Sequence, residues 1–164
     1  EESSHYSRKQ LSLLEYLSSV AHAGHSICVH TPASETSGML SHLGEDYFSI
    51  SPSDYSTHVV VYVVNNFSSS KIEIDVLEKE NKSWKTALFR LDKSFHSLID
   101  ELSTSTKETE IETVQGNIHR GKIQMLKDSI VVTPTGSESK ASAMVEEGTT
   151  ILPLEAVVAL SYDI

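Results

Sequence analysis

Residues 46–53 read DYFSISPS, and residues 128–135 return the pattern as DSIVVTPT. Each stretch has an acidic residue, a short apolar run and a proline, which is typical of a half-buried strand that ends in a turn. Two more pairs precede them in the same order: SLLEYLS (12–18) with SLIDELS (97–103), and SGML (37–40) with RGKI (120–123). We therefore interpret the chain as one supersecondary unit used twice.

Each unit is predicted to contain a helix followed by five strands. In the first unit, leucines at helical spacing predict a helix over about residues 7–20, which Gly24 ends. Period-two alternation between turn-forming residues then predicts strands over 26–30, 38–43, 47–51, 57–64 and 71–76. The second unit is predicted to have a helix over about 94–102 and strands over 111–114, 122–126, 129–133, 150–153 and 156–161. Its longer connection, residues 136–148, is predicted to be an exposed, mobile hairpin tip.

This pattern predicts a mainly β fold with helices (α+β), built from two helix-plus-five-stranded small barrels that are related by internal duplication. The predicted boundaries are 1–76 for the first unit, 77–93 for a connector and 94–164 for the second unit. Residues 57–64 form a strand long and apolar enough to need a partner. We expect the second unit to supply that partner, which would leave one free strand edge at each end.

The connector, residues 77–93, allows two interpretations. Apolar residues step by four and three along it, namely Trp84, Leu88, Leu91, Phe95, Leu98 and Leu102. This spacing favours one long amphipathic helix that runs into the second unit. The alternative is a hairpin that turns at residues 81–82, with Ala87, Phe89 and Leu91 alternating on its return strand.

The composition limits the classes of partner. The chain has 164 residues, 13 Lys and Arg against 23 Asp and Glu, and a formal charge of −10. Such a chain repels phosphate backbones on average, so nucleic-acid binding would need a local basic patch. The longest apolar run, Val59 to Val64, is far shorter than a membrane-spanning helix requires. With one cysteine, Cys28, the sequence predicts a cytoplasmic protein that makes no membrane contact.

Residues 121–132 read GKIQMLKDSIVV and residues 151–160 read ILPLEAVVAL. They resemble the second and third strands and the closing pair of strands in the Sm-like family, which includes the bacterial RNA chaperone Hfq. Gly38 and Gly121 stand where such a strand must bend sharply. The resemblance implies small barrels that associate edge to edge through their fourth and fifth strands.

The resemblance also implies candidate RNA contacts. The matching loop positions hold His42, Leu43 and Gly44 in one unit and Leu126, Lys127 and Asp128 in the other. The candidate nucleic-acid-binding residues are therefore His42, Tyr47 and Lys127. Neither closing turn carries the Arg-Gly or Lys-His signature with which family members bind RNA.

A second candidate surface lies in the connector, where Trp84 and Lys85 stand among other lysines. Aromatic and cationic side chains together can bind single-stranded nucleic acid. The alternative is a solvated helix face whose lysines extend over an apolar stripe.

Histidines crowd the first unit, and a metal site centred on Cys28, His25 and His30, with His22 nearby, is conceivable. The spacing is no recognised zinc signature, so exposed polar histidines are the preferred interpretation and no metal or cofactor is predicted. The chain also lacks a Gly-x-Ser-x-Gly elbow and a glycine-rich phosphate loop. We therefore predict that the protein is not an enzyme.

The predicted function is a non-enzymatic binding or scaffolding module of the Sm-like type. Its partner would be another protein, or a second copy of the chain, joined through exposed strand edges. Single-stranded RNA binding of the Hfq kind is the first alternative. A metal-dependent activity at the His/Cys cluster is the second.

Overall fold

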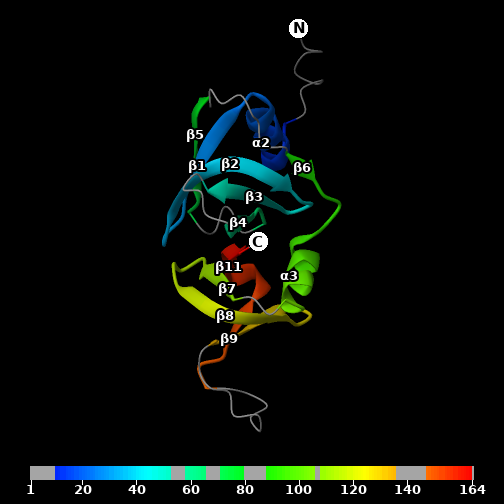
Figure 1. Cartoon of the computed structure of the whole chain (residues 1–164), viewed down its shortest axis with the longest axis vertical. Coiled ribbons are helices and arrows are strands. Elements are labelled where there is room, and N and C mark those ends of the chain that lie inside the picture. The colour runs from blue at the N-terminus through cyan, green and yellow to red at the C-terminus, as the bar shows by residue number, and fades with distance from the viewer. Residues whose placement is uncertain are drawn as a thin grey trace.

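The computed structural model describes residues 10–52, 58–65, 71–79, 88–105, 108–135 and 147–163. Within them, eleven strands form one sheet, and two α-helices and a short 3₁₀ helix accompany it (Figure 1). The helices are α2 (Leu13–His22), α3 (Phe95–Ser103) and η1 (Leu154–Ala156). The strands are β1 (His25–His30), β2 (Glu35–Leu43), β3 (Tyr47–Pro52), β4 (His58–Val63), β5 (Glu73–Lys79), β6 (Phe89–Arg90), β7 (Thr109–Thr113), β8 (Ile118–Met125), β9 (Ser129–Thr133), β10 (Thr150–Pro153) and β11 (Val157–Asp163).

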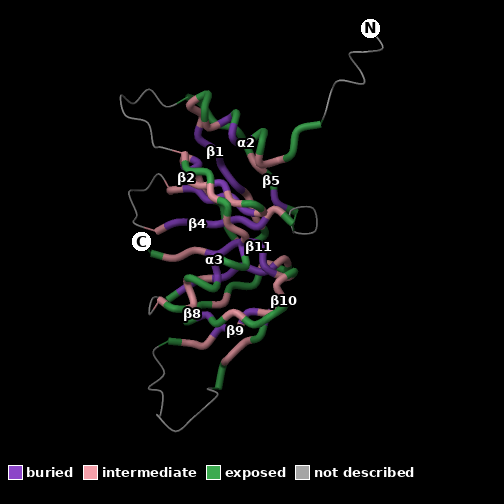
Figure 2. The backbone as a smooth tube through the Cα atoms, turned by 90° about the vertical axis from the view of Figure 1, so that its right-hand side faces the viewer, coloured by how far each residue is buried: buried purple, intermediate pink, exposed green. Residues whose placement is uncertain are grey.

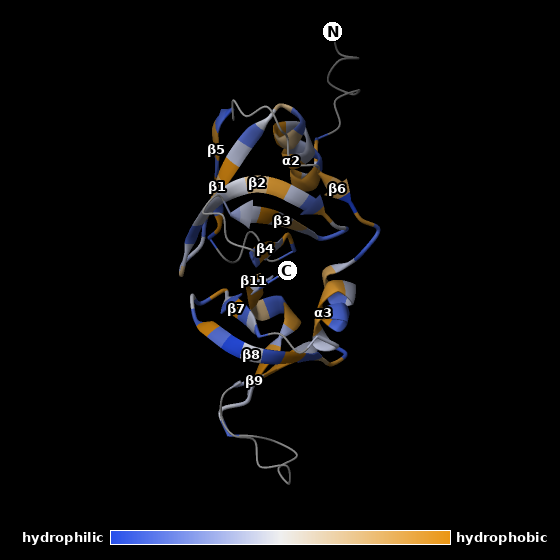
Figure 3. Ribbon diagram, in the orientation of Figure 1, coloured by the Kyte–Doolittle hydropathy of each residue, from blue (hydrophilic) through white to orange (hydrophobic). Residues whose placement is uncertain are grey.

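The predicted strands and both predicted helices are found, most of them with ends that differ by a few residues. The first helix begins at Leu13, later than the predicted residue 7. The helix α2 begins at Leu13 because Ser12 and Glu15 form a capping box that satisfies the first free backbone amides. Its buried residues include Leu17 and Val20, and it packs on β1 and β2. Both helices carry hydrophobic and hydrophilic residues side by side (Figure 3), as expected of helices that cover one side of a sheet.

The prediction of two separate five-stranded barrels is wrong. The strands form one open sheet in the order β10-β9-β8-β7-β11-β4-β3-β2-β1-β5, with β6 attached to β2. The two halves contribute strands in the same spatial order, but β11 pairs with β7 on one side and with β4 on the other. In the antiparallel β4–β11 pair, Tyr62 lies opposite Ala159 at one end, and His58 lies opposite Asp163 at the other end. The strand β11, which is predicted to belong to the second barrel alone, therefore pairs with strands of both halves.

The sequence of β4 explains why it lies in the middle of the sheet. Val59, Val61 and Val63 enter one core cluster, which α3 and the second half mostly supply. Val60 and Tyr62 enter the other cluster, which α2 and the first half mostly supply. A strand buried on both faces must be apolar without alternation, and the continuous burial is visible along this strand (Figure 2).

The strand β11 is divided between the same two clusters. Val157 and Leu160 belong to one cluster, and Val158 and Ala159 belong to the other. These four residues do not simply alternate between the two faces of the strand, because the register with β7 shifts between Val157 and Ala159. Such a bulge changes the face that the following residues occupy. Each hydrophobic core therefore contains side chains from both halves of the chain.

A buried carboxylate also joins the halves. Glu112 in β7 is 6% exposed. Its Oε1 accepts hydrogen bonds from Thr31 Oγ1 (2.7 Å) and Ser34 Oγ (3.0 Å), and its Oε2 accepts one from the Ala33 amide (3.3 Å). These donors lie in the turn between β1 and β2. The three hydrogen bonds replace the water that this carboxylate loses on burial.

The prediction of one long helix through the connector is wrong for the residues that the structure describes. Residues 88–94 are not helical, and Phe89–Arg90 forms β6, parallel to β2 at His42 and Leu43. The edge of β2 is free there because β1 pairs with β2 only as far as Gly38. Residues 80–87, which include the predicted hairpin turn, lie outside the described residues, as do residues 136–146 of the predicted hairpin tip.

The start of α3 is fixed by two side chains. Ser94 Oγ accepts a hydrogen bond from the Ser97 amide (3.1 Å), and Asp46 Oδ1 accepts one from the Phe95 amide (2.7 Å). Both satisfy amides that a helix leaves free at its first turn. Asp46 lies in the turn between β2 and β3, so the beginning of α3 is tied to the first half of the chain.

Candidate functional site

The two ends of the sheet are its most exposed parts. Among the described residues, β5 pairs only with β1 and β10 pairs only with β9, so each presents an unpaired edge. Nearly all of β5 is exposed, including Val76 and Leu77. In β10, Ile151 is 64% exposed. Unpaired strand edges with exposed apolar side chains are templates for pairing with another strand.

The two edges differ in charge. The strand β5 carries three carboxylates, Glu73, Asp75 and Glu78, and one lysine, Lys79. The strand β10 has the sequence Thr-Ile-Leu-Pro and carries no charge. Pairing β5 with a second β5 would bring like charges together, whereas pairing it with β10 would not.

His42 and Tyr47, two of the predicted RNA-binding residues, lie in the first half. His42 is half-buried in β2, and its ring stacks on the exposed ring of Phe89 with 5.6 Å between centroids. Burial lowers the pKa of His42, and the positive charge of Lys93 lowers it further. The imidazole is therefore mostly neutral at pH 7 and brings little positive charge to a phosphate.

Tyr47 lies in the core, where it is 1% exposed and its ring packs on that of Phe95. Lys127 is exposed in the turn between β8 and β9, in the other half of the chain. The structure therefore does not bring these three residues together: Tyr47 is buried, and Lys127 and His42 lie on elements from different halves of the chain. Trp84 and Lys85 lie outside the described residues.

Tyr47→Phe is expected to stabilise the protein by about 1 kcal/mol at pH 7, because Tyr47 Oη is buried without a hydrogen-bond partner in the described part of the chain. Burial, mainly, raises the pKa of Tyr47 to about 12, above the value near 10 expected when the chain is unfolded. Between pH 10 and pH 12 the unfolded chain loses this proton first, so wild-type stability falls by up to about 1.4 kcal/mol per pH unit from this group. Urea unfolding of both proteins at pH 7, 10 and 11 measures the difference, which should widen with pH. A constant difference across this range would contradict the assignment.

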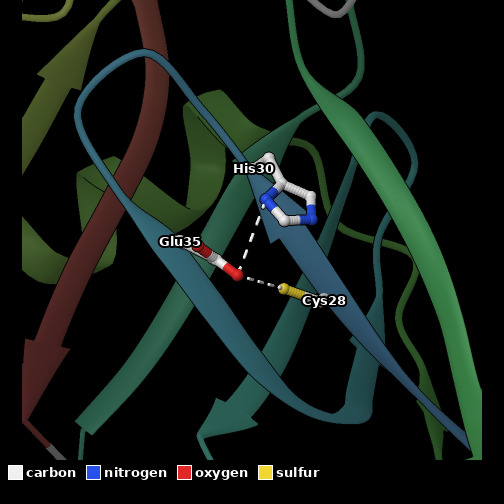
Figure 4. A group of neighbouring side chains, drawn as sticks. All are labelled: Cys28, His30 and Glu35. Carbon is white, nitrogen blue, oxygen red and sulfur yellow. Dashed lines mark hydrogen bonds and ion pairs between the residues drawn. The ribbon is translucent and has the colours of Figure 1, made fainter.

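Three side chains that can ligate a metal converge on one face of the first half (Figure 4). Cys28 and His30 lie two residues apart in β1, and Glu35 lies in β2 directly across from His30. Cys28 Sγ donates a hydrogen bond to Glu35 Oε1 at 3.5 Å, and His30 Nδ1 lies 3.8 Å from the same oxygen. Asp75 in β5 accepts from the other ring nitrogen, His30 Nε2, at 2.7 Å.

The residues predicted for a metal site are thus partly brought together. Cys28 and His30 lie in one group, but His25 Nδ1 bonds to the carbonyl of Leu77 (2.7 Å) and His22 Nδ1 to the carbonyl of Ser18 (2.7 Å). Sequence reasoning missed Glu35 and Asp75, because only the pairing of β2 and β5 with β1 reveals them as neighbours. Burial raises the pKa of the Cys28 thiol, while a hydrogen bond with Ser37 lowers it and Glu35 raises it. The thiol is therefore protonated at pH 7 when no metal ion is bound to it.

A cleft of about 530 Å³ lies where the halves meet. Its lining includes His58 from β4, Glu110 from β7, Arg120 from β8 and Tyr162 from β11. Arg120 is paired with Glu110 (2.7 Å) and Glu108 (3.4 Å). Its charge is therefore already balanced by carboxylates within the chain.

No protein-family model matches the sequence, and no curated protein matches it. None of the helices in the described ranges is long and apolar enough to cross a membrane.

Proposed function

We propose that this protein is a non-enzymatic scaffolding module that associates with further copies of itself through the edges of its sheet. One observation carries the proposal. Inside the chain, the fourth strand of the first half (β4) already pairs with the last strand of the second half (β11). The strands left at the two ends are the last large strand of the first half (β5) and the fourth strand of the second half (β10). The same kind of pairing is therefore available between chains.

In this proposal, β10 of one copy pairs antiparallel with β5 of the next, as β4 pairs with β11. The contact is head-to-tail, so it produces a closed ring or an open filament, depending on the rotation per copy. Exposed Ile151 on one edge and Val76 and Leu77 on the other would be covered. The proposed contact resembles the edge-to-edge association of Sm-like proteins. We expect the module to act in the cytoplasm.

Size-exclusion chromatography with light scattering tests the association. The mean mass should rise above the 18.1 kDa of one chain as concentration increases. Ile151→Lys in β10 and Val76→Lys in β5 should each lower the mass toward that of the monomer. Ile118→Lys is the matched control, because Ile118 is also exposed but lies in β8, opposite Glu112 of β7 and away from the two end strands β5 and β10. A strict monomer at all concentrations would remove the proposal.

RNA binding of the Hfq kind is the alternative, and the observation in its favour is the exposed position of Lys127 beside the resembling strands. It predicts binding to single-stranded RNA that weakens steeply between 50 and 200 mM salt. It also predicts that Lys127→Glu reduces that binding. Fluorescence anisotropy with labelled RNA measures both, and no binding at low salt would exclude this alternative.

A further inference from the structure

We propose that Cys28, His30 and Glu35 bind a thiophilic divalent cation such as Zn²⁺, with Asp75 holding His30 in place. This inference is independent of the proposed self-association. The three ligand residues come from two neighbouring strands, and the fourth residue comes from a strand on the other side of β1. One sulfur, one imidazole nitrogen and one carboxylate oxygen form a donor set that suits zinc.

The distances between the ligand atoms fit this ion. Bond lengths of about 2.3 Å to sulfur and about 2.0–2.2 Å to nitrogen and oxygen place tetrahedral zinc ligands roughly 3.3–3.6 Å apart. The observed separations are 3.5 Å between Cys28 Sγ and Glu35 Oε1, and 3.8 Å between His30 Nδ1 and Glu35 Oε1. All three atoms lie within 4.8 Å of one another. Small side-chain rotations would therefore complete the three bonds.

Asp75 provides a second, separate observation. Its carboxylate lies 2.7 Å from His30 Nε2, which favours a proton on that nitrogen. Nδ1 then carries a lone pair, directed toward the side where Glu35 Oε1 and Cys28 Sγ lie (Figure 4). A carboxylate on the outer nitrogen is the usual partner of a metal-binding histidine. The competing explanation is a His30 ring that bridges the carboxylates of Glu35 and Asp75 by itself and needs no metal.

The fold holds these groups in place before any ion binds. Cys28 and His30 project from the same face of β1 because they are two residues apart, and β1 is paired on both sides. Cys28 is buried, whereas the side chains of His30 and Glu35 are 35% and 67% exposed. An ion can therefore enter from solvent, and a water molecule can fill the fourth position. Binding replaces the thiol proton, which passes to the solvent, and involves no oxidation or reduction.

Titration of the full chain with Co²⁺ tests the site, because a cysteine thiolate bound to Co²⁺ gives a charge-transfer band in the near ultraviolet. Cys28 is the only cysteine, so this band reports on it alone. The band should saturate at one Co²⁺ per chain and should disappear when one equivalent of Zn²⁺ is added. His96→Gln, on the exposed face of α3, is the control and should leave the titration unchanged.

Three variants assign the individual roles. Cys28→Ser should abolish the band, and Glu35→Gln should weaken Co²⁺ binding at least about tenfold. Asp75→Asn should weaken it about 10–100-fold while keeping the band, because Asp75 positions His30 and does not touch the ion. Glu35 and Asp75 are exposed, so their variants keep the test decisive even where Cys28→Ser does not fold. Absence of the band with wild-type protein, or equal affinity in all variants, would overturn the proposal in favour of a His30 that bridges the two carboxylates without a metal.

Discussion

Gly38→Ala and Gly121→Ala are each expected to destabilise the protein by about 3 kcal/mol or more. A Cβ atom at Gly38 would lie 2.1 Å from the backbone oxygen of Ser51, and one at Gly121 would lie 2.1 Å from that of Thr133. Because the obstacle is backbone on the neighbouring strand, no side-chain rotation can relieve the contact. The strands would have to move apart, and β2–β3 or β8–β9 pairing would be lost locally.

Gly24→Ala is the matched control for these two variants. Gly24 has a φ of +87°, but a Cβ there would have no heavy atom within 4 Å. The substitution should therefore cost only the strain of a left-handed backbone, about 1–2 kcal/mol. Urea unfolding of the three variants measures the free energies directly. Equal losses in all three would show that the close approach of the strands does not govern stability at Gly38 and Gly121.

Leu160→Ala in β11 is expected to cost about 2–5 kcal/mol and to weaken both halves together. Leu160 is 1% exposed, and it lies opposite Val61 of β4 and Ile111 of β7. A cavity at this position is next to the β4–β11 pair, which within the described ranges is the only strand pair that joins the two halves. Because each core contains side chains from both halves, the loss should not be confined to one of them.

Hydrogen exchange followed by mass spectrometry measures this effect. In Leu160→Ala, peptides from β1–β3 and from β8–β9 should exchange faster by similar factors. Leu154→Ala is the control, because Leu154 is only half-buried at the edge of the same cluster and should cost about 1 kcal/mol. Faster exchange in the second half alone would mean that the halves fold independently.

The local structure could be predicted because short patterns decide it. Alternation of Phe48 and Ile50 with serines predicts a strand, and leucines at helical spacing predict the first helix, whose start at Leu13 lies later than the predicted residue 7. The partner of the last strand could not be predicted. Val157 to Leu160 are apolar enough to close a barrel within the second half or to join β4, and their local sequence is compatible with both. Which strand β11 pairs with depends on how the side chains of both halves pack into the two hydrophobic cores.

The candidate site was predictable to the same limited extent. Cys28 and His30 share a face by spacing alone, whereas Glu35 and Asp75 join them through strand pairing that no local pattern reveals. Tyr47 is a predicted RNA contact, and it shares a side of its strand with Ser49, opposite the side of Phe48 and Ile50. It is buried because α3 packs against the side of Tyr47, through Phe95. A helix from the other half of the chain thus decides its environment.

Cross-linking between two separately prepared proteins tests the proposed association most directly. One protein carries Val76→Cys in β5 and the other carries Ile151→Cys in β10, and they are mixed with a short thiol-reactive cross-linker. We predict a cross-linked dimer in this mixture and much less in either protein alone, with wild type as the control for reaction at the buried Cys28. Equal yields in the mixture and in each single protein, or no dimer at all, would contradict β5–β10 pairing between chains.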